Sequence, residues 1–331
     1  MQRNYFKQIL VALFVLVGVT ACDTSEHPTI TPLKKVGFQS DVIKRSLGPN
    51  VVGQEIEFAF AMALPSAQGK LVSAEVKASI PGAAGTFLET KSYYTDGSGN
   101  DIGVTVAQPF LNEGGVTRVN FSADTSAATL RYYYRIPEAA KGQKVSFEFI
   151  STSSTGEKVT YTMGPYDIAK MDMVLDLDMQ DNGRAYISLA DMKVYTAAEA
   201  AQNPDKIDLV YLYRSIPGIT FNHALVAPAA NAQYLPGVTL PAGVNRSAKI
   251  SKVWNLRDFH LARLQFSIFI DDLDFEKLNI ADAPNYAINM RAEAGAWVET
   301  ADGKYRAFIY MNTVNNTTRS ARISIKRYQM N

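Results

Sequence analysis

The stretch "TLRYYYRI", residues 129–136, alternates between two kinds of side chain with a period of two. One set is apolar or aromatic: Leu130, Tyr132, Tyr134 and Ile136. The other set is polar or has a polar end: Thr129, Arg131, Tyr133 and Arg135. Because successive side chains of a strand point to opposite faces, this pattern predicts a strand that buries one face and exposes the other to water. Sandwiches of antiparallel sheets are built from such strands.

The same alternation recurs through the first half of the chain. It is found in "EIEFAFAM" (residues 55–62), "KLVSAEVKASI" (70–80) and "KVSFEFI" (144–150). In the second of these we expect Val72, Ala74 and Val76 to face the core. Segments rich in turn-forming residues separate the strands: "PGAAG" (81–85), "DGSGN" (96–100), "NEGG" (112–115) and "SSTGE" (153–157). We therefore predict an Ig-like β-sandwich over residues 36–168.

The second half of the chain adds helical signals to the strands. In "YTAAEAAQNP" (195–204), Thr196 and Glu199 form a capping box, in which each side chain accepts a hydrogen bond from a backbone amide of the first turn. Four alanines favour a helix over residues 197–203. Pro204 ends this helix, because proline cannot continue it.

Further strands complete this half. "IDLVYLYR" (207–214) is apolar enough for a strand buried on both faces, and "DDLDFEKLNIADAP" (271–284) can hold a second short helix capped by its acidic residues. "AWVETADGKYRAFIYMN" (296–312) predicts a hairpin, and "ARISIKRY" (321–328) predicts one more strand. We predict a β-rich sandwich with one or two short helices over residues 169–331. The fold class is therefore mostly β, with two sandwich domains.

The first residues have the pattern of a secretion signal. Two basic residues precede an apolar run, residues 9–19, which is shorter than the ~20 residues needed to span a bilayer. Small residues then precede Cys22, the only cysteine of the chain. "VTAC" resembles the lipobox of bacterial lipoproteins, which implies that Cys22 becomes the acylated N-terminus. We predict a signal peptide over residues 1–21, lipidation at Cys22, and a polar tether over residues 22–35.

Composition and charge argue against one class of partner. The chain has 33 basic and 32 acidic residues, and loss of a signal peptide with Arg3 and Lys7 leaves 31 against 32, a net charge of −1. Nucleic-acid binding needs clustered Lys and Arg, and no long basic run is present, so we do not expect a nucleic acid as partner. A single cysteine leaves no partner for an intrachain disulfide, so packing must stabilise both domains.

The sequence lacks the usual local signatures of an enzyme. No nucleophile elbow, phosphate-binding loop or dinucleotide fingerprint occurs. "DGSGND" (96–101) begins like a calcium loop but departs from it at the sixth and twelfth positions. Two further sets lack metal-ligand spacing: His27, His223 and His260, and Asp176, Asp178 and Asp181. We therefore expect a protein that is not an enzyme, with no cofactor and no metal.

Aromatic side chains are the remaining candidates for a binding site, because the apolar faces of sugar rings stack on them. We single out Trp254 and Trp297, together with Tyr133, which lies between Arg131 and Arg135. Another interpretation stays open for each. A tryptophan is often a core anchor, and a row of arginine and tyrosine is often a solvated strand face.

Longer segments of the chain resemble surface lipoproteins of Bacteroidetes. They are "RYYYRIPEAAKGQKVSFEFISTSSTGEKVTY" (131–161), "ISLADMKVYTAAEAAQNPDKIDLVYLY" (187–213), "TADGKYRAFIYMN" (300–312) and "ARISIKRY" (321–328). The resemblance implies a lipid-anchored protein of the outer membrane or cell surface. Such proteins often belong to polysaccharide-uptake systems, which makes polysaccharide or an outer-membrane uptake complex the expected partner.

The sequence thus predicts a lipid-anchored, non-catalytic cell-envelope protein that binds glycan or assists a polysaccharide-uptake complex. The alternative is a fimbrillin-like structural or adhesion subunit, since those are also lipoproteins with two β-domains. A glycosidase would need two carboxyl groups at a set separation across the scissile bond, and no local motif indicates such a pair.

Overall fold

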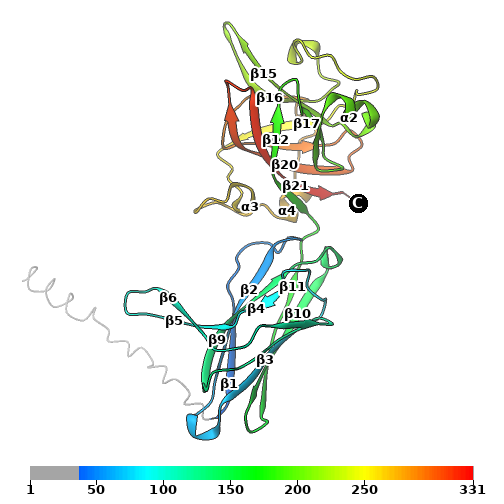
Figure 1. The fold of residues 1–331 in the computed structure, drawn as a ribbon. Helices are drawn as coiled ribbons and strands as arrows, with labels where there is room; N and C mark the ends of the chain where they lie inside the picture. Colours follow the sequence, from blue (N-terminus) through cyan, green and yellow to red (C-terminus); the bar gives the residue numbers. More distant parts are fainter. Residues whose placement is uncertain (1–36, 331) are drawn as a thin grey trace, which may run out of the picture. The chain divides into compact units, whose positions relative to one another are not determined.

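The computed structural model of the chain describes residues 37–330. The predicted signal peptide (1–21), the tether (22–35) and the lipidation residue Cys22 lie outside these residues and stay predictions. The described residues form two antiparallel β-sandwiches (Figure 1), so the predicted mostly-β class with two sandwich domains is confirmed. In the described part of the chain, none of the helices has the length and apolar character required to cross a membrane.

The first sandwich is built from two sheets whose strands all pair in antiparallel fashion. One sheet has the order β1-β2-β9-β4, formed by β1 (Gln39–Lys44), β2 (Glu55–Ala63), β9 (Ala127–Arg135) and β4 (Phe87–Leu88). The other has the order β11-β10-β3-β8-β7, formed by β11 (Lys158–Asp167), β10 (Lys144–Ser153), β3 (Leu71–Ala78), β8 (Val116–Asn120) and β7 (Leu111–Glu113). A separate two-stranded hairpin, β5 (Lys91–Thr95) and β6 (Asp101–Thr105), extends from this sandwich (Figure 1).

Aromatic rings fill the space between these two sheets. Phe58 of β2 lies at the centre, with its ring centroid 4.9 Å from that of Phe147 and 5.2 Å from that of Phe149. The inner residues predicted from "EIEFAFAM", "TLRYYYRI" and "KVSFEFI" are all buried, so the alternation is confirmed there. The prediction for Val72 is wrong, because this side chain is 42% exposed. A register shift between β10 and β3 occurs at Leu71, which is buried in place of Val72.

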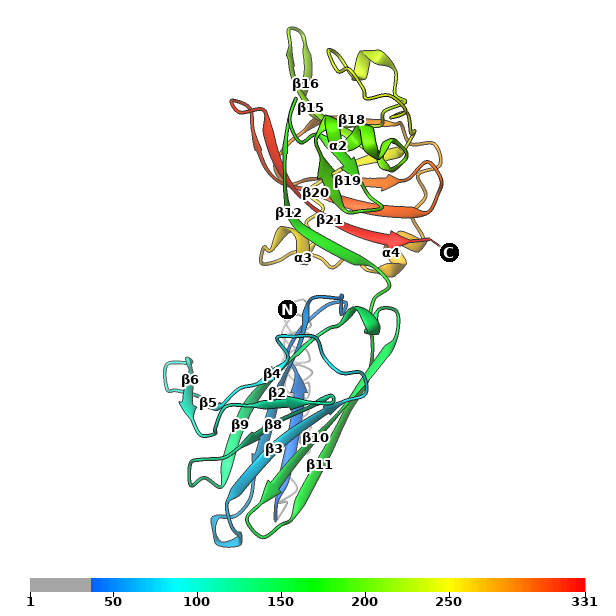
Figure 2. The ribbon, with the colours of Figure 1, turned by 45° about the vertical axis from the view of Figure 1, so that its right-hand side comes forward.

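The second sandwich also has two antiparallel sheets, whose strands can be followed in Figure 2. The first has the order β12-β21-β20-β19-β17, formed by β12 (Asp172–Gln180), β21 (Ser320–Gln329), β20 (Tyr305–Asn315), β19 (Ala294–Glu299) and β17 (Lys249–Trp254). The second has the order β14-β13-β15-β16-β18, formed by β14 (Lys193–Tyr195), β13 (Tyr186–Ser188), β15 (Leu209–Ile216), β16 (Ile219–Val226) and β18 (Tyr286–Met290). Residues 209–212 of β15 are buried on both faces of the strand, as predicted.

Three short α-helices belong to this half: α2 (Ala197–Gln202), α3 (Phe259–Ala262) and α4 (Asp272–Glu276). The acidic start of α4 works as predicted, because Asp271 and Asp274 form a capping box. Helix α3 was not predicted. It has only four residues, and its one sequence signal is the N-cap Asp258, which accepts a hydrogen bond from the amide of Leu261.

A buried ion pair joins the α3 segment to the sheet. The Lys326 ammonium of β21 donates to Asp258 Oδ2 at 2.7 Å and to the carbonyl oxygen of Ile270 at 2.8 Å. Both charged side chains are completely buried. Asp258 also accepts from the amides of Leu261 (3.0 Å) and Ile270 (2.8 Å). Both charged groups of the pair are therefore hydrogen-bonded to the backbone as well as to each other. Burial lowers the pKa of Lys326, and the Asp258 carboxylate opposes this effect.

The cap of α2 provides a stability test. Thr196 Oγ1 accepts from the Glu199 amide at 3.3 Å, and Glu199 Oε2 accepts from the Thr196 amide at 2.7 Å. We expect Thr196→Ala to lower the free energy of unfolding by about 1 kcal/mol, because an orphan amide of the first turn loses its acceptor. Urea denaturation measures this difference. Thr196→Ser, which keeps the hydroxyl, is the control, and equal stability of the alanine and serine variants would contradict the prediction.

Candidate functional site

The outer face of the sheet β1-β2-β9-β4 brings together part of the predicted site. Strand β9 places Arg131, Tyr133 and Arg135 on this face, because the alternate residues Tyr132 and Tyr134 are buried in the core. In the strand register, Tyr133 lies between Glu57 of β2 and Phe87 of β4. The polar face of β9 that the sequence predicts is therefore extended, on the neighbouring strand β4, by the aromatic ring of Phe87.

Two aromatic rings stack on this face. The rings of Phe87 and Tyr133 have centroids 4.7 Å apart and an interplanar angle of 17°. The ring of Phe110 lies beside them, with its centroid 6.1 Å from that of Phe87, and is 42% exposed. Three rings thus form a partly exposed apolar group on an otherwise polar face.

The β5–β6 hairpin adds a fourth ring. Tyr93 of β5 covers the Arg131 guanidinium, whose central carbon is 3.9 Å from the ring centroid. Arg131 also forms an ion pair with Asp101 of β6, which fixes the hairpin to β9. The amide of Thr129 donates to Ser92 Oγ at 3.0 Å and holds the base of the hairpin. The hairpin therefore positions its tyrosine through contacts with the predicted site residue Arg131.

A cavity of about 360 Å³ opens between these elements. It is lined by Phe87, Leu88, Glu89, Thr90, Lys91, Tyr93, Pro109 and Phe110. Glu89 Oε2 is buried and has no hydrogen-bond partner in residues 37–330. A buried acceptor without a donor costs free energy, so a hydroxyl group of a ligand could stabilise this oxygen. The neighbouring Glu89 side chain raises the pKa of Tyr93.

Arg135 does not belong to this group. Its guanidinium faces Glu55 at 3.5 Å in a partly exposed ion pair, whereas Arg131 contacts the Tyr93 ring and Tyr133 stacks on Phe87. Of the three residues predicted on β9, the structure therefore brings Arg131 and Tyr133 to the aromatic surface and leaves Arg135 as part of a solvated pair. We refer to Phe87, Tyr93, Phe110, Arg131 and Tyr133 as the aromatic surface.

The two predicted tryptophans do not form a common platform. Trp297 pairs with Ser251 across β19 and β17, whereas Trp254 pairs with Ala294. Since Ser251 and Trp254 are three residues apart on one strand, the two rings lie on opposite faces of the sheet. Trp297 packs against Phe275 and Phe308, with centroids 5.3 and 4.8 Å away, while Trp254 is 52% exposed.

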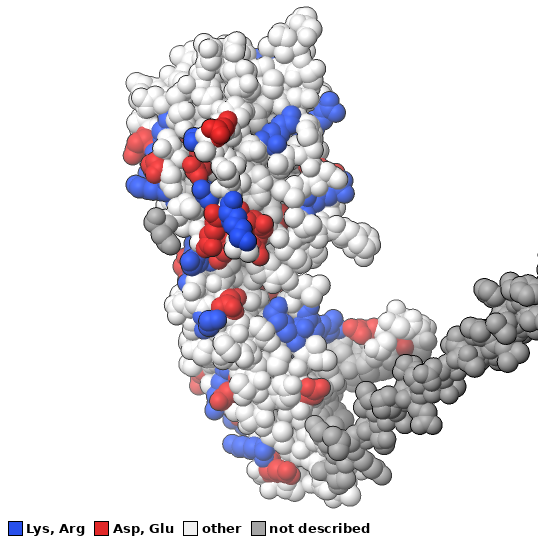
Figure 3. Space-filling view, turned by 180° about the vertical axis from the view of Figure 1, so that it is seen from behind, with Lys and Arg blue, Asp and Glu red and all other residues white. Residues whose placement is uncertain are grey.

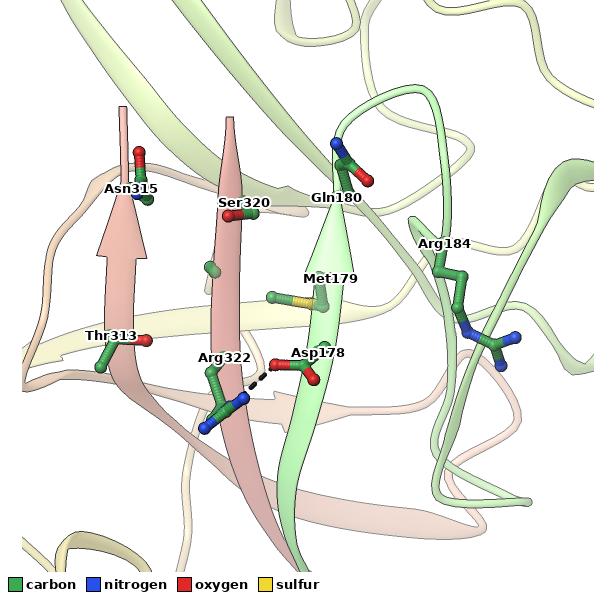
Figure 4. A pocket seen from close by; sticks show the side chains of 9 residues that line it. Asp178, Met179, Gln180, Arg184, Thr313, Asn315, Ser320 and Arg322 are labelled. Carbon is green, nitrogen blue, oxygen red and sulfur yellow. Dashed lines mark hydrogen bonds and ion pairs between the residues drawn. The ribbon is translucent and has the colours of Figure 1, made fainter. Parts of the chain in front are cut away.

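A larger, polar pocket of about 510 Å³ lies at one end of the second sandwich (Figure 4). It is lined by Asp178, Met179, Gln180, Arg184, Thr313, Asn315, Ser320, Ala321 and Arg322. Figure 4 shows Asp178 of β12 turned toward Arg322 of β21, and their side chains are 2.7 Å apart. This pocket has many hydrogen-bonding groups but contains no aromatic ring on which a sugar could stack.

The three acidic residues at the end of β12 and just after it each pair with a different arginine. The pairs are Asp176 with Arg263 at 2.6 Å, Asp178 with Arg322 at 2.7 Å, and Asp181 with Arg214 at 2.5 Å. Each carboxylate is thus neutralised separately. Within residues 37–330, no group of three side chains is arranged to hold a metal ion. On the face of the molecule shown in Figure 3, Lys and Arg alternate with Asp and Glu, and no large area has a single sign.

Sequence reasoning missed Phe87, Tyr93 and Phe110. Phe87 belongs to a strand of two residues, which is too short to give an alternation. Tyr93 is one of two consecutive tyrosines that precede the "DGSGN" turn, and this pair in a hairpin was the available signal. Nothing in the local sequence around Phe110 indicates that it approaches Phe87.

The fold and the aromatic surface define a class: a two-domain antiparallel β-sandwich protein with a ligand-sized hollow on its first domain. Residues 35–168 match the family described as "Domain of unknown function (DUF4466)", and residues 169–330 match "Domain of unknown function (DUF8576)". The chain belongs to the DUF4466 family. A DUF4466 family protein from Parabacteroides merdae ATCC 43184, known from a crystal structure, is 44% identical to it, with a TM-score of 0.84. The match covers 89% of this chain and 99% of that protein.

Other solved structures are much less similar. The major pilin subunit BcpA of Bacillus cereus is 8% identical, with a TM-score of 0.28 over 87% of this chain and 66% of the pilin. A cohesin module of a family 33 glycoside hydrolase from Clostridium perfringens ATCC13124 is 12% identical, with a TM-score of 0.24 over 40% of this chain and 98% of the module. These scores are too low to support an argument about function. No curated protein matches the chain.

Proposed function

We propose that this protein is a lipid-anchored, non-catalytic component of the cell envelope that binds glycan through the aromatic surface of its first sandwich. The observation that supports the proposal most is the combination of partly exposed rings and an unpaired buried acceptor around one cavity. A sugar has apolar ring faces, which can stack on the aromatic rings, and hydroxyl donors, which can bind the Glu89 oxygen.

The size of the cavity fits this ligand class. Small-molecule sites commonly have volumes of about 300–1,000 Å³ with apolar walls and a few polar groups that fix orientation. The 360 Å³ hollow is at the low end of that range and suits one or two sugar residues of a longer chain. Phe87 and Phe110 supply apolar walls, and Glu89 supplies the polar group that can accept from a sugar hydroxyl.

The membrane anchor in this proposal rests on the sequence of the first 22 residues. One acyl chain gives only marginal membrane binding, whereas several chains on one cysteine hold a protein firmly. An anchored binding protein keeps captured polysaccharide at the outer membrane or cell surface, where an uptake complex can receive it. Mass spectrometry of the native protein tests this part. The expected result is an N-terminal Cys22 that carries acyl chains.

The binding test compares two neighbouring tyrosines of the hairpin. Tyr93 lines the cavity, whereas Tyr94 is exposed and lies outside its lining. We expect a glycan array with the full-length protein in detergent to identify a ligand, and Tyr93→Ala and Phe110→Ala to weaken its binding about tenfold each, in line with ~1–3 kcal/mol for a ring that stacks. Titration calorimetry measures the change.

Tyr94→Ala is the matched control and is expected to bind as the unmodified protein does. Two results count against the proposal: no binding of any plant, host or microbial polysaccharide at millimolar concentration, or equal binding by the Tyr93→Ala and Tyr94→Ala variants. Circular dichroism of each variant verifies that the sandwich is still folded.

A further inference from the structure

Trp254 lies at an edge of the second sandwich and is accompanied by two cations. It is the last residue of β17, the edge strand of its sheet, and it is 52% exposed. The Lys252 ammonium is 4.3 Å from the centroid of its ring, and the central carbon of the Arg291 guanidinium is 6.0 Å from it. Both distances are within the range of cation–π attraction.

Lys252 is held in place by backbone oxygens of the facing sheet. Its ammonium donates to the carbonyl of Ile288 at 2.7 Å and to that of Asn289 at 3.1 Å, both in β18. These two bonds leave one of the three ammonium protons for the Trp254 ring or for a ligand. Burial and the nearby Arg291 charge lower the pKa of Lys252, so the charged form is less stable here than in water.

Lys252 and Arg291 differ from the neighbouring arginine in their ion pairing. Over residues 37–330, neither Lys252 nor Arg291 forms an ion pair with a carboxylate. The neighbouring Arg257 differs, because it pairs with Glu293. Two like charges next to each other repel, and an anion placed between them would relieve this repulsion.

Two asparagines orient this group. Asn222 of β16 and Asn289 of β18 both have left-handed backbone conformations, with φ of 51° and 53°. Asparagine tolerates this conformation better than most residues. Asn222 Nδ2 donates to Asn289 Oδ1 at 3.0 Å, and Arg291 Nε donates to the same oxygen at 3.4 Å. The amides therefore hold the Arg291 side chain beside the exposed ring.

We propose that Trp254, Lys252 and Arg291 form a second binding site, for a saccharide whose ring carries a carboxylate or sulfate group. The exposed face of the indole stacks on the sugar ring, Arg291 binds the anionic group, and the fixed charge of Lys252 adds attraction. This site is in the other sandwich and does not depend on the aromatic surface. Its two cations favour anionic saccharides, whereas the cavity beside the aromatic surface is lined by the Glu89 carboxylate.

The experiment titrates the full-length protein with an oligogalacturonate and with a neutral galactose oligomer of equal length. Exposed Trp254 should report binding by a change in tryptophan fluorescence, while Trp297, which packs between Phe275 and Phe308, contributes a constant background. We expect the acidic oligomer to bind and the affinity to fall as salt is added, because salt screens exposed charges. The neutral oligomer should give no change at the same concentration.

Four variants test the residues, and titration calorimetry measures their binding because Trp254→Ala lacks the fluorescent reporter. Trp254→Ala is expected to abolish binding of the acidic oligomer, and Arg291→Ala to weaken it about tenfold, as for loss of one charged hydrogen bond. Lys277→Ala removes an exposed cation elsewhere in the same sandwich and should leave binding unchanged. Tyr93→Ala should also leave it unchanged, which separates this site from the aromatic surface.

A sulfated galactose oligomer forms the second arm of the titration. Binding of either the carboxylated or the sulfated oligomer, lost in Trp254→Ala, supports the proposal and identifies the preferred anion. The proposal is overturned if neither acidic oligomer binds, if neutral and acidic oligomers bind equally, or if Trp254→Ala binds normally. Trp254→Phe, which keeps a ring, is expected to retain part of the affinity in calorimetry, and circular dichroism of Trp254→Ala verifies that this variant is folded.

Discussion

Replacement of Lys326 by methionine is expected to lower the free energy of unfolding by about 3–5 kcal/mol, because it leaves the Asp258 carboxylate buried without its cation. The methionine fills a similar volume, so the loss reports charge and not an empty space. Urea denaturation followed by tryptophan fluorescence measures it. Lys326 of β21 pairs with Phe308 of β20, which in turn pairs with Trp297 of β19, so this fluorophore lies in the same row of the sheet.

The control for this prediction is an exposed ion pair on the same strand. Arg322 pairs with Asp178 at 2.7 Å, and both side chains are about half exposed or more. We expect Arg322→Met to cost less than about 1 kcal/mol, since water screens such a pair. Adding Asp258→Asn to Lys326→Met should recover part of the loss, because a neutral amide is less costly to bury than an unpaired carboxylate. A loss below 1 kcal/mol in Lys326→Met would show that Asp258 is not left unpaired.

Replacement of Phe58 by alanine is expected to destabilise the first sandwich by about 3–5 kcal/mol, the usual cost of removing a buried phenylalanine ring. The ring is completely buried and contacts the rings of Phe147, Phe149 and Tyr166. Residues 38–168 contain no tryptophan, so tryptophan fluorescence does not report this domain. Hydrogen exchange, read by mass spectrometry on peptides from β2, β9 and β10, does.

Phe58→Leu and Phe110→Ala are the matched controls. Leucine keeps most of the apolar volume and is expected to cost less than about 1.5 kcal/mol. Phe110 is a partly exposed ring of the same domain, so its loss should change the protection of core amides little. Equal protection in Phe58→Ala and Phe110→Ala would contradict the central role of Phe58 in this core.

Much of the fold could be predicted from the sequence because burial follows a period of two along each strand. Phe58, Tyr132 and Phe147 were assigned to the core from alternation alone, and all three are buried. Val72 was not assigned correctly, because one extra residue in the pairing of β3 with β10 reverses the faces beyond it. The four residues of α3 are too few to give a helical period, so only its cap could have indicated it.

Less of the candidate site could be predicted, because it depends on contacts between distant segments. Arg131 and Tyr133 were found since they lie on the polar face of one strand. Their partners Phe87 and Tyr93 come from a two-residue strand and from a hairpin outside both sheets, and sequence does not show where these pack. The positions of the two tryptophans could not be predicted for a related reason: the face of the sheet on which each ring lies depends on the register of β17 and β19.

Strand β21 lies between β12 and β20, so it must pair on both sides before its sheet is complete. Residues 320–329 are synthesised after all the other strands of that sheet. At about 5–20 residues per second, the ribosome takes roughly 7–30 s to pass from β12 to β21. During that interval the half-built domain is open to chaperones. Until β21 is made, this sheet lacks the strand that joins β12 to β20.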